Sequence, residues 1–401
     1  MSQPQNTGSH THQQQKNEAK RLERRQREGQ GDNYRRYREV HSALKQFYFH
    51  APQGNLARHL NTLAWLISGI VGSQRTNYRA VAKKSPDGTK VESRVKQFSR
   101  WVNNDRVTTE TYFAPYALLL LASLAHRPMA LVIDGSCVGK NCQALVISVV
   151  YKQRALPVGW LVVEGSKGHL SEENHLILVR QVAELVPPVA TVIFLGDGEF
   201  DGVQLQAAMA ELNWQYVCRT AKDIILTEEE EAFTVQELGL RPGQLIALPD
   251  VAFTEEQYGP VQVVAWWKKG ETHPIFLVTN MELAGEACWW YKKRFRIETF
   301  FSDQKSRGFH LHQSHLKNPD RLATLMIAAC LAYIWIVYLG RYAQQTGWDK
   351  IIHRSDRCDL SLFQLGLDML EYFLNEGLPI PVAFQMSLRL DSVPYLLPEE
   401  V

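Results

Sequence analysis

The order of aliphatic runs between Met129 and Phe200 constrains the fold of this chain more than any other feature. Three runs, MALVIDGS, QALVISVVYKQ and ALPVGWLVVEG, have the length and the Val, Ile and Leu content of buried strands. A helix is predicted from Ser171, because SEENHLILVRQVAEL has acids in its first turn. A fourth strand follows in ATVIFLGDGEF. Strands that alternate with helices in this way predict an α/β fold.

Two acids follow the aliphatic parts of these strands. Asp134 is expected to end the first strand and Asp197 to end the fourth. An Asp in such a position is commonly only a turn residue. Glu199 and Asp201 are the alternatives to Asp197, but they lie beyond Gly198 and are expected to cap the next helix.

The stretch WWYKKRFRIETFFSDQKSRGFHL, residues 289–311, is expected to form one helix with a polar working face. At about 100° per residue, four polar side chains fall within about one sixth of the circle. These four are Tyr291, Arg294, Glu298 and Lys305. An apolar stripe beside them consists of Trp290, Ile297 and Phe301. An acid among cations suits metal-dependent phosphoryl transfer, because the acid holds a divalent ion while the cations hold phosphates. The simpler alternative is a solvated amphipathic helix.

The spacing Y-x2-R-x3-E-x6-K of these four residues resembles the signature of DDE transposases of the insertion-sequence-four family. This resemblance covers residues 130–345 and implies an RNase H-like catalytic core. It implies that Asp134, Asp197 and Glu298 are the catalytic acids and hold two Mg²⁺ (or Mn²⁺) ions per active site. It also implies DNA contacts by residues of the signature stretch, which are Tyr291, Lys292, Lys293, Arg294 and Lys305. Phe295 departs from the family pattern, in which Trp is frequent at this position.

The function that this resemblance implies is cut-and-paste transposition. Such a protein binds terminal inverted repeats, cuts the element ends with water, joins the 3′ hydroxyl ends to target DNA and opens the second strand through a hairpin. Its partners are double-stranded DNA and a second copy in a paired-end complex, and its place is the bacterial cytoplasm, on the nucleoid when bound to DNA. Two alternatives remain, which are a structure-selective nuclease of the same fold and a domesticated DNA-binding protein without catalysis. The second requires a broken triad, whereas all three acids are present.

Charge is divided unevenly along the chain. Residues 1–129 carry 21 Lys and Arg against 9 Asp and Glu, and residues 130–401 carry 23 against 33. A basic front is typical of a module that binds a polyanion. We predict a flexible basic tail at 1–50 and a helical DNA-binding domain of the helix-turn-helix type at 51–127. Its expected DNA contacts lie on a cationic helix face and are Arg94, Lys96 and Arg100. A plain helical bundle with a charged surface is the alternative.

The remaining boundaries follow the strand and helix patterns. The catalytic core is predicted at 128–220 and 285–345, interrupted by a β-rich insertion at 221–284. In that insertion a hairpin is expected around residues 268–272, and Trp266 and Trp267 beside it are expected either to stack on an unpaired base or to lie in the core. A helical region of unassigned role is predicted at 346–401.

Three further patterns limit the class of protein. Six cysteines without a C-x-x-C pair indicate a reduced, cytosolic protein without structural zinc. The uncharged run at 322–340 is long enough to span a membrane, but its place after a catalytic helix favours a buried core helix, so no membrane partner is expected. The histidines of H-x-H-x-x-H at 310–315 are expected to contact phosphate or to support the site, because DDE chemistry uses carboxylates.

Overall fold

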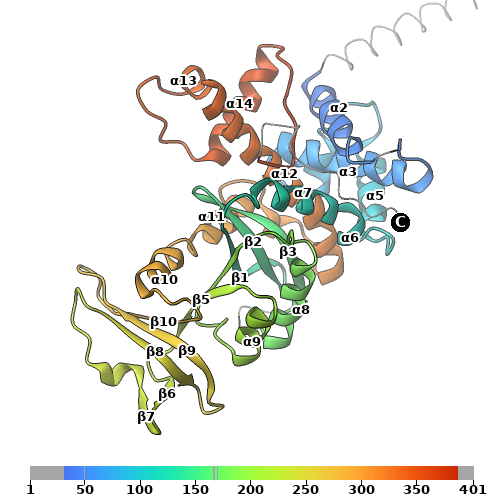
Figure 1. Ribbon diagram of the computed structural model, residues 1–401. Coiled ribbons are helices and arrows are strands. Elements are labelled where there is room, and N and C mark those ends of the chain that lie inside the picture. The colour runs from blue at the N-terminus through green and yellow to red at the C-terminus, as the bar shows by residue number, and fades with distance from the viewer. Residues whose placement is uncertain (1–30, 49, 166–167, 169, 387–401) are drawn as a thin grey trace, which may run out of the picture.

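The computed structural model describes residues 31–48, 50–165, 168 and 170–386, which form a mixed α/β fold with one large sheet and many helices (Figure 1). The described strands make a ten-stranded sheet in the order β3-β2-β1-β4-β5-β10-β9-β8-β6-β7. The strands are β1 (Met129–Gly139), β2 (Cys142–Tyr151), β3 (Arg154–Glu164), β4 (Val192–Gly196), β5 (Gln215–Thr220), β6 (Ile225–Glu228), β7 (Glu231–Thr234), β8 (Leu245–Phe253), β9 (Tyr258–Trp266) and β10 (Ile275–Thr279).

The helices lie mainly before, between and after these strands. They are α2 (Asp32–Lys45), α3 (Gly54–Ser73), α4 (Tyr78–Ala82), α5 (Val91–Val102), α6 (Thr109–Tyr112), α7 (Ala114–Leu124), α8 (Glu172–Ala183), α9 (Val203–Glu211), α10 (Ala284–Tyr291), α11 (Arg296–Gln304), α12 (Pro319–Thr346), α13 (Asp349–Ile352) and α14 (Leu362–Asn375), with 3-10 turns η1 (Val235–Leu238) and η2 (Leu311–Gln313).

The four strands that the sequence predicts form one end of the sheet, from the edge strand β3 to β4. β1 pairs antiparallel with β2 and parallel with β4, and β4 pairs parallel with β5. β4 is buried at every position, as expected for a strand covered on both faces. The predicted helix after Ser171 is α8, and Ser171 is its N-cap residue. The strand-helix-strand order from Met129 to Gly196 is therefore confirmed.

Helices cover both faces of this part of the sheet, which consists of β1 to β4. Gly159 and Trp160 of β3 are consecutive, so their Cβ positions point to opposite faces. A Cβ on Gly159 would lie 2.6 Å from Val182 of α8, whereas Trp160 Nε1 donates a hydrogen bond to the carbonyl oxygen of Ala323 in α12 at 3.1 Å. α8 therefore lies on one face and α12 on the other.

α12 is the central helix of the second face. By length and composition it is the one helix in the described part of the chain that could cross a membrane. However, 89% of its most apolar window is buried inside the protein, in agreement with the predicted core helix. α14 crosses it so closely that a Cβ on Gly366 would lie 1.9 Å from the carbonyl oxygen of Ile336, and a Cβ on Gly340 equally close to that of Leu362.

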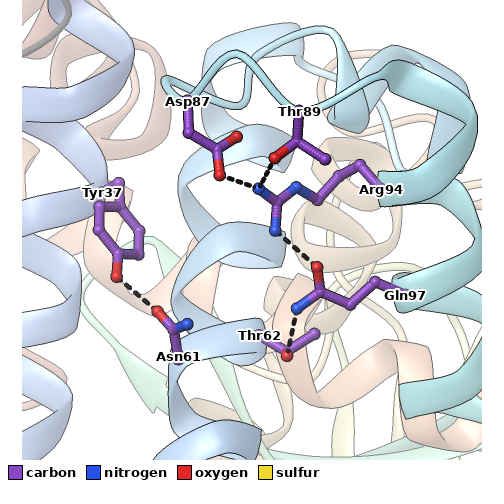
Figure 2. Close-up of polar contacts among 7 residues, drawn as sticks. All are labelled: Tyr37, Asn61, Thr62, Asp87, Thr89, Arg94 and Gln97. Atoms are coloured by element: carbon purple, nitrogen blue, oxygen red, sulfur yellow. Dashed lines mark hydrogen bonds and ion pairs between the residues drawn. The ribbon is translucent and has the colours of Figure 1, made fainter. Parts of the chain in front are cut away.

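Part of the predicted flexible tail is a packed helix. Residues 1–30 lie outside the described residues, but α2 buries Val40 and Leu44 against its surroundings and contacts α3. Tyr37 of α2 stacks on Trp65 of α3 with ring centroids 4.2 Å apart. Tyr37 also donates a hydrogen bond to Asn61 Oδ1 at 2.5 Å (Figure 2). The prediction of a mobile segment up to residue 50 is therefore wrong for residues 32–45.

Arg94 of α5 faces inward. Its guanidinium pairs with Asp87, and Nη1 donates to Gln97 Oε1 at 2.5 Å (Figure 2). The guanidinium carbon also lies 4.1 Å from the centre of the Trp65 ring. Only 4% of Arg94 is exposed, so its expected place on an exposed cationic face is wrong. The helical count explains this, because Arg94 follows Val91 by three residues and precedes the buried Phe98 by four. Lys96 and Arg100 are exposed, as expected.

The strands of the segment at 221–284 extend the sheet beyond β5. β10 pairs with β5 on one side and with β9 on the other, so the additional strands continue the hydrogen-bonded order of the core. The expected hairpin is the β9–β10 pair. In Figure 1 these strands (yellow) lie at the end of the molecule opposite α2, α3 and the C-terminal α13 and α14.

Candidate active site

The register of β1 and β4 brings Asp134 and Asp197 together. Val132 pairs with Leu195 in parallel register, and each acid lies two residues beyond this pair on the same side of its strand. Asp197 directly follows β4, as predicted. Asp134 lies inside β1 rather than at its end, because β1 continues to pair with β2 as far as Gly139. The expected strand end at Asp134 is therefore wrong, although the expected meeting of the two acids is right.

The signature stretch forms two helices instead of one. α10 ends at Tyr291 and α11 begins at Arg296. The turn between them is held by short-range bonds, such as Arg294 N–H to the Tyr291 carbonyl at 2.9 Å. Lys305 follows the last residue of α11, outside the helical region of backbone conformation. The predicted continuous helix is therefore wrong, but Trp290, Ile297 and Phe301 are buried as the apolar stripe required.

Arg294 lies between the three predicted catalytic acids. Its Nη1 atom is 3.6 Å from Asp134 Oδ2 and 3.7 Å from Asp197 Oδ2. Its Nη2 atom donates a hydrogen bond to Glu298 Oε1 at 3.3 Å. The turn after α10 therefore delivers a cation, and α11 delivers the third acid, to the edge where β1 and β4 carry the first two.

Asp134 is the most buried of these acids. Burial and the nearby charge of Asp197 raise the pKa of Asp134 to about 6, and the Arg294 guanidinium opposes this increase. The Gly135 N–H also donates to Asp134 Oδ1 at 2.7 Å. A carboxylate in this position is stabilised in its charged form by any cation that approaches it.

The donor set at this edge suits a hard divalent cation. Its ligands would be carboxylate oxygens, which Mg²⁺ and Mn²⁺ prefer. Asp134 Oδ2 and Asp197 Oδ2 already converge on one nitrogen atom of Arg294. No three His, Cys, Asp or Glu side chains among the described residues are close enough together to hold one ion. The three acids fit a metal centre by their chemistry. To hold one ion together, their side chains must move into the space where the guanidinium of Arg294 now lies.

Lys305 lies on the same edge of the sheet. Its Nζ atom donates a hydrogen bond to Ser136 Oγ at 2.5 Å, and Ser136 lies two residues after Asp134, on the same face of β1. Burial lowers the pKa of Lys305. Sequence analysis missed Ser136, although the two-residue period of a strand places it beside Asp134.

A buried ion pair fixes α11 against the sheet. Arg154 Nη1 at the start of β3 lies 2.6 Å from Asp303 Oδ2 in α11, and the two side chains are 11% and 5% exposed. Burial raises the pKa of Asp303 to about 6 against the charge of Arg154. Asp303 follows Glu298 by five residues, so this pair positions the helix that carries the third acid. Sequence analysis did not identify it.

The other predicted DNA contacts differ in exposure. Tyr291 is 2% exposed, so it does not share an open face with Glu298. Lys292 is exposed and its Nζ lies 5.0 Å from the centre of the Trp266 ring. The Nζ atom of Lys293 lies 3.4 Å from the centre of the Trp289 ring, and burial lowers the pKa of Lys293 to about 8. Trp267 is half-buried at the hairpin tip, where its Nε1 donates to the Glu271 carbonyl at 2.9 Å.

Glu199 and Asp201 do not cap the next helix. Glu199 Oε1 accepts a hydrogen bond from the Leu170 N–H at 2.7 Å, and the N-cap residue of α9 is Gly202. Glu172 of α8 accepts from Leu205 N–H of α9 instead, at 2.9 Å. The capping prediction is therefore wrong.

The histidine motif lies just beyond Lys305. The rings of His310 and His312 are 5.9 Å apart, and the His310 carbonyl accepts a hydrogen bond from Thr76 Oγ1 at 3.3 Å. The motif thus joins the segment between α3 and α4 to the residues that follow Lys305. Its expected contact with phosphate stays a prediction.

Comparison with known proteins identifies the family. The family described as "Transposase DDE domain" matches residues 127–335, more than half of the chain and the part that contains all three acids. A comparison with curated proteins finds no match. Among solved structures, the cryo-EM structure of the piggyBac transposase synaptic complex with hairpin DNA is similar at a TM-score of 0.42 and 10% identity, over 86% of this chain and 78% of that chain. The chain belongs to the transposase DDE domain family.

Proposed function

We propose that this protein is a cut-and-paste DNA transposase of the insertion-sequence-four group, with an RNase H-like core and a Y-R-E-K signature. The observation that carries the proposal is the convergence of Asp134, Asp197 and Glu298 on Arg294 at one edge of the sheet. Proteins with DDE domains use divalent metal ions, and these three carboxylates are the groups that would hold two Mg²⁺ or Mn²⁺ ions.

The reaction consists of hydrolysis and transesterification steps at DNA phosphates, and it needs no external energy source. Water attacks the phosphorus atom at the element end and the 3′ oxygen leaves as a hydroxyl. That hydroxyl then attacks a phosphate of the opposite strand, which releases the 3′ oxygen of the flanking DNA and forms a hairpin. Water opens the hairpin and restores the 3′ hydroxyl, which attacks a phosphate of the target and displaces a 3′ oxygen of the target strand. Asp134, Asp197 and Glu298 would hold the divalent ions, which would supply a lower pKa for the attacking hydroxyl or water and stabilisation of the leaving oxygen. Lys305 neutralises the phosphate near Asp134, and the exposed Lys292 beside Trp266 holds the strand.

A basic hollow supports DNA binding by the N-terminal helices. This hollow of about 390 Å³ lies between the end of α3 and the residues after α4, and its cations are Arg75, Arg79, Lys83 and Lys84. Arg75 Nη1 donates to Gln313 Oε1 at 3.1 Å, in the loop that follows Lys305. This contact joins the hollow to the segment that follows Lys305, and a hollow with four cations suits a DNA phosphate backbone.

Lys83→Ala/Lys84→Ala is expected to weaken binding of duplex DNA and to reduce the salt dependence of the affinity. Each lost phosphate contact lowers the slope of log K against log salt by about 0.9. Fluorescence anisotropy with a labelled duplex at several salt concentrations measures both effects.

Two double variants provide comparison. Lys350→Ala/Arg354→Ala removes the same charge from the region of α13 and is expected to leave the affinity nearly unchanged. Lys96→Ala/Arg100→Ala tests the surface of α5. A larger loss in the α5 variant than in the Lys83→Ala/Lys84→Ala variant would place the main duplex contact on α5 instead of the hollow.

A strand-transfer assay tests the proposed function. The substrates are an uncleaved and a pre-cleaved DNA end, taken from any inverted repeats beside the coding region, each incubated with plasmid target, full-length protein and Mg²⁺. Joined products support a transposase. Cleavage without joining supports the structure-selective nuclease, and binding without either reaction supports a domesticated DNA-binding protein. Sedimentation with and without paired ends tests the proposed homodimer.

A further inference from the structure

We propose that Arg294 is an internal counter-ion that holds the three catalytic acids together without metal, competes with divalent ions for them, and moves to DNA phosphate when ions bind. This inference rests on the proposed function, because it takes Asp134, Asp197 and Glu298 as the groups that hold the ions. It assigns to Arg294 two successive partners instead of a permanent phosphate contact.

The position of Arg294 is that of a cation shared by all three acids. Both Asp oxygens approach Nη1 at 3.6 and 3.7 Å, and Glu298 approaches Nη2 at 3.3 Å. The residue is 7% exposed. Its guanidinium therefore lies in the space that a shared ion needs, and it neutralises part of the charge that three close carboxylates would otherwise leave unbalanced.

The same contacts are loose. A charge-assisted hydrogen bond between Arg and a carboxylate is usually about 2.7–2.9 Å long and frequently bidentate, and all three contacts here are longer. Within the described residues, the buried Nε atom of Arg294 has no hydrogen-bond partner. Attraction holds this side chain, but the donor geometry is not satisfied. Such an arrangement suits a group that exchanges its partners.

An alternative position for the guanidinium is adjacent. Its carbon atom lies 4.4 Å from the centre of the Phe295 ring, and Phe295 is 48% exposed. Arg294 belongs to the turn between α10 and α11 and not to a helix interior. A modest rotation of the side chain along the Phe295 ring therefore moves the charge from the acids toward solvent, where a DNA phosphate can accept a bidentate pair.

Electrostatics couples this movement to the ions. A divalent ion between the acids repels a guanidinium a few ångströms away, so both cannot occupy the same space. A phosphate that attracts Arg294 outward vacates the acids for the ion. By linkage, DNA must then increase metal affinity by the same factor by which metal increases DNA affinity. In metal-free protein, Arg294 therefore neutralises part of the charge of the three acids until DNA binds.

The test is Mn²⁺ binding by the full-length protein, followed by electron paramagnetic resonance of free Mn²⁺ with and without a duplex of the element end. Arg294→Gln is expected to bind Mn²⁺ at least tenfold more tightly than wild type without DNA and to lose the increase in affinity that DNA causes. Arg294→Lys is expected to lie between them. Arg307→Gln removes the same charge from an exposed residue shortly after α11 but does not vacate the acids, so a change of less than about threefold is expected.

Thermal unfolding provides a second readout. Without metal at neutral pH, Arg294→Gln is expected to unfold at a lower temperature than wild type, and Mn²⁺ should restore most of the difference. A deficit that persists with Mn²⁺, or Mn²⁺ binding no tighter than in wild type, overturns the inference while leaving the transposase proposal intact. Mn²⁺ binding that is unaffected by Asp134→Asn and Glu298→Gln overturns both.

Discussion

Asp134→Asn, Asp197→Asn and Glu298→Gln are each expected to reduce DNA cleavage and joining about a thousandfold or more, while DNA binding survives. Each substitution removes one anionic oxygen donor from the edge where β1, β4 and α11 meet. A metal centre supplies several kcal/mol of transition-state stabilisation, and a loss of about 4 kcal/mol corresponds to roughly a thousandfold in rate. Single-turnover cleavage with Mg²⁺, run beside a gel shift, measures both properties.

Asp201→Asn is the matched control. Asp201 lies four residues after Asp197, and burial raises the pKa of its carboxyl. We expect this variant to retain activity within a few-fold of wild type. Loss of cleavage in Asp201→Asn together with full activity in Asp197→Asn would show that the second catalytic acid is Asp201 and not Asp197.

Gly366→Ala is expected to destabilise the protein by about 3 kcal/mol or more. A methyl group there would meet the Ile336 carbonyl oxygen of α12 at 1.9 Å, so α14 must move away from the helix that forms the centre of one face. Overpacking of a close-packed interior costs about 1–3 kcal/mol and occasionally more, and a backbone atom cannot rotate aside as a side chain can. Urea unfolding followed by circular dichroism measures the change.

Gly285→Ala provides the comparison for this variant. Gly285 lies in α10, and among the described residues no atom approaches within 4 Å of its ideal Cβ position. Replacing a helical Gly by Ala at an open position stabilises by about 0.5–1 kcal/mol. Equal urea midpoints for Gly366→Ala and wild type would contradict the close crossing of α12 and α14.

The core of the fold was predictable because its signals are local and repeated. Aliphatic runs fixed β1 to β4, and the acids after Ser171 marked the start of α8. The continuation of β1 past Asp134 was not predictable from Gly135 and Ser136, which resemble a turn. Pairing with β2 keeps these residues extended, and that pairing is a tertiary contact.

The proximity of the predicted acids could be inferred from the sequence, but their detailed arrangement could not. Strand order was enough to bring Asp134 and Asp197 together. The break between α10 and α11 has no Pro or Gly to announce it, since its sequence is KKRF. Tertiary contacts favour the break, because Arg294 reaches acids on two strands while Trp290 and Ile297 are both buried. A helical projection carries no information about such contacts.

The continuous order of the ten-stranded sheet has a mechanical consequence. The hairpin that carries Trp266 joins β5 through β10, and β5 joins β4, which Asp197 directly follows. Hydrogen-bonded strands side by side resist stretching, so the hairpin cannot swing away from the acids as a hinged arm would. Under the proposed function, a DNA strand bound at the hairpin would therefore be cut at a fixed distance from that contact.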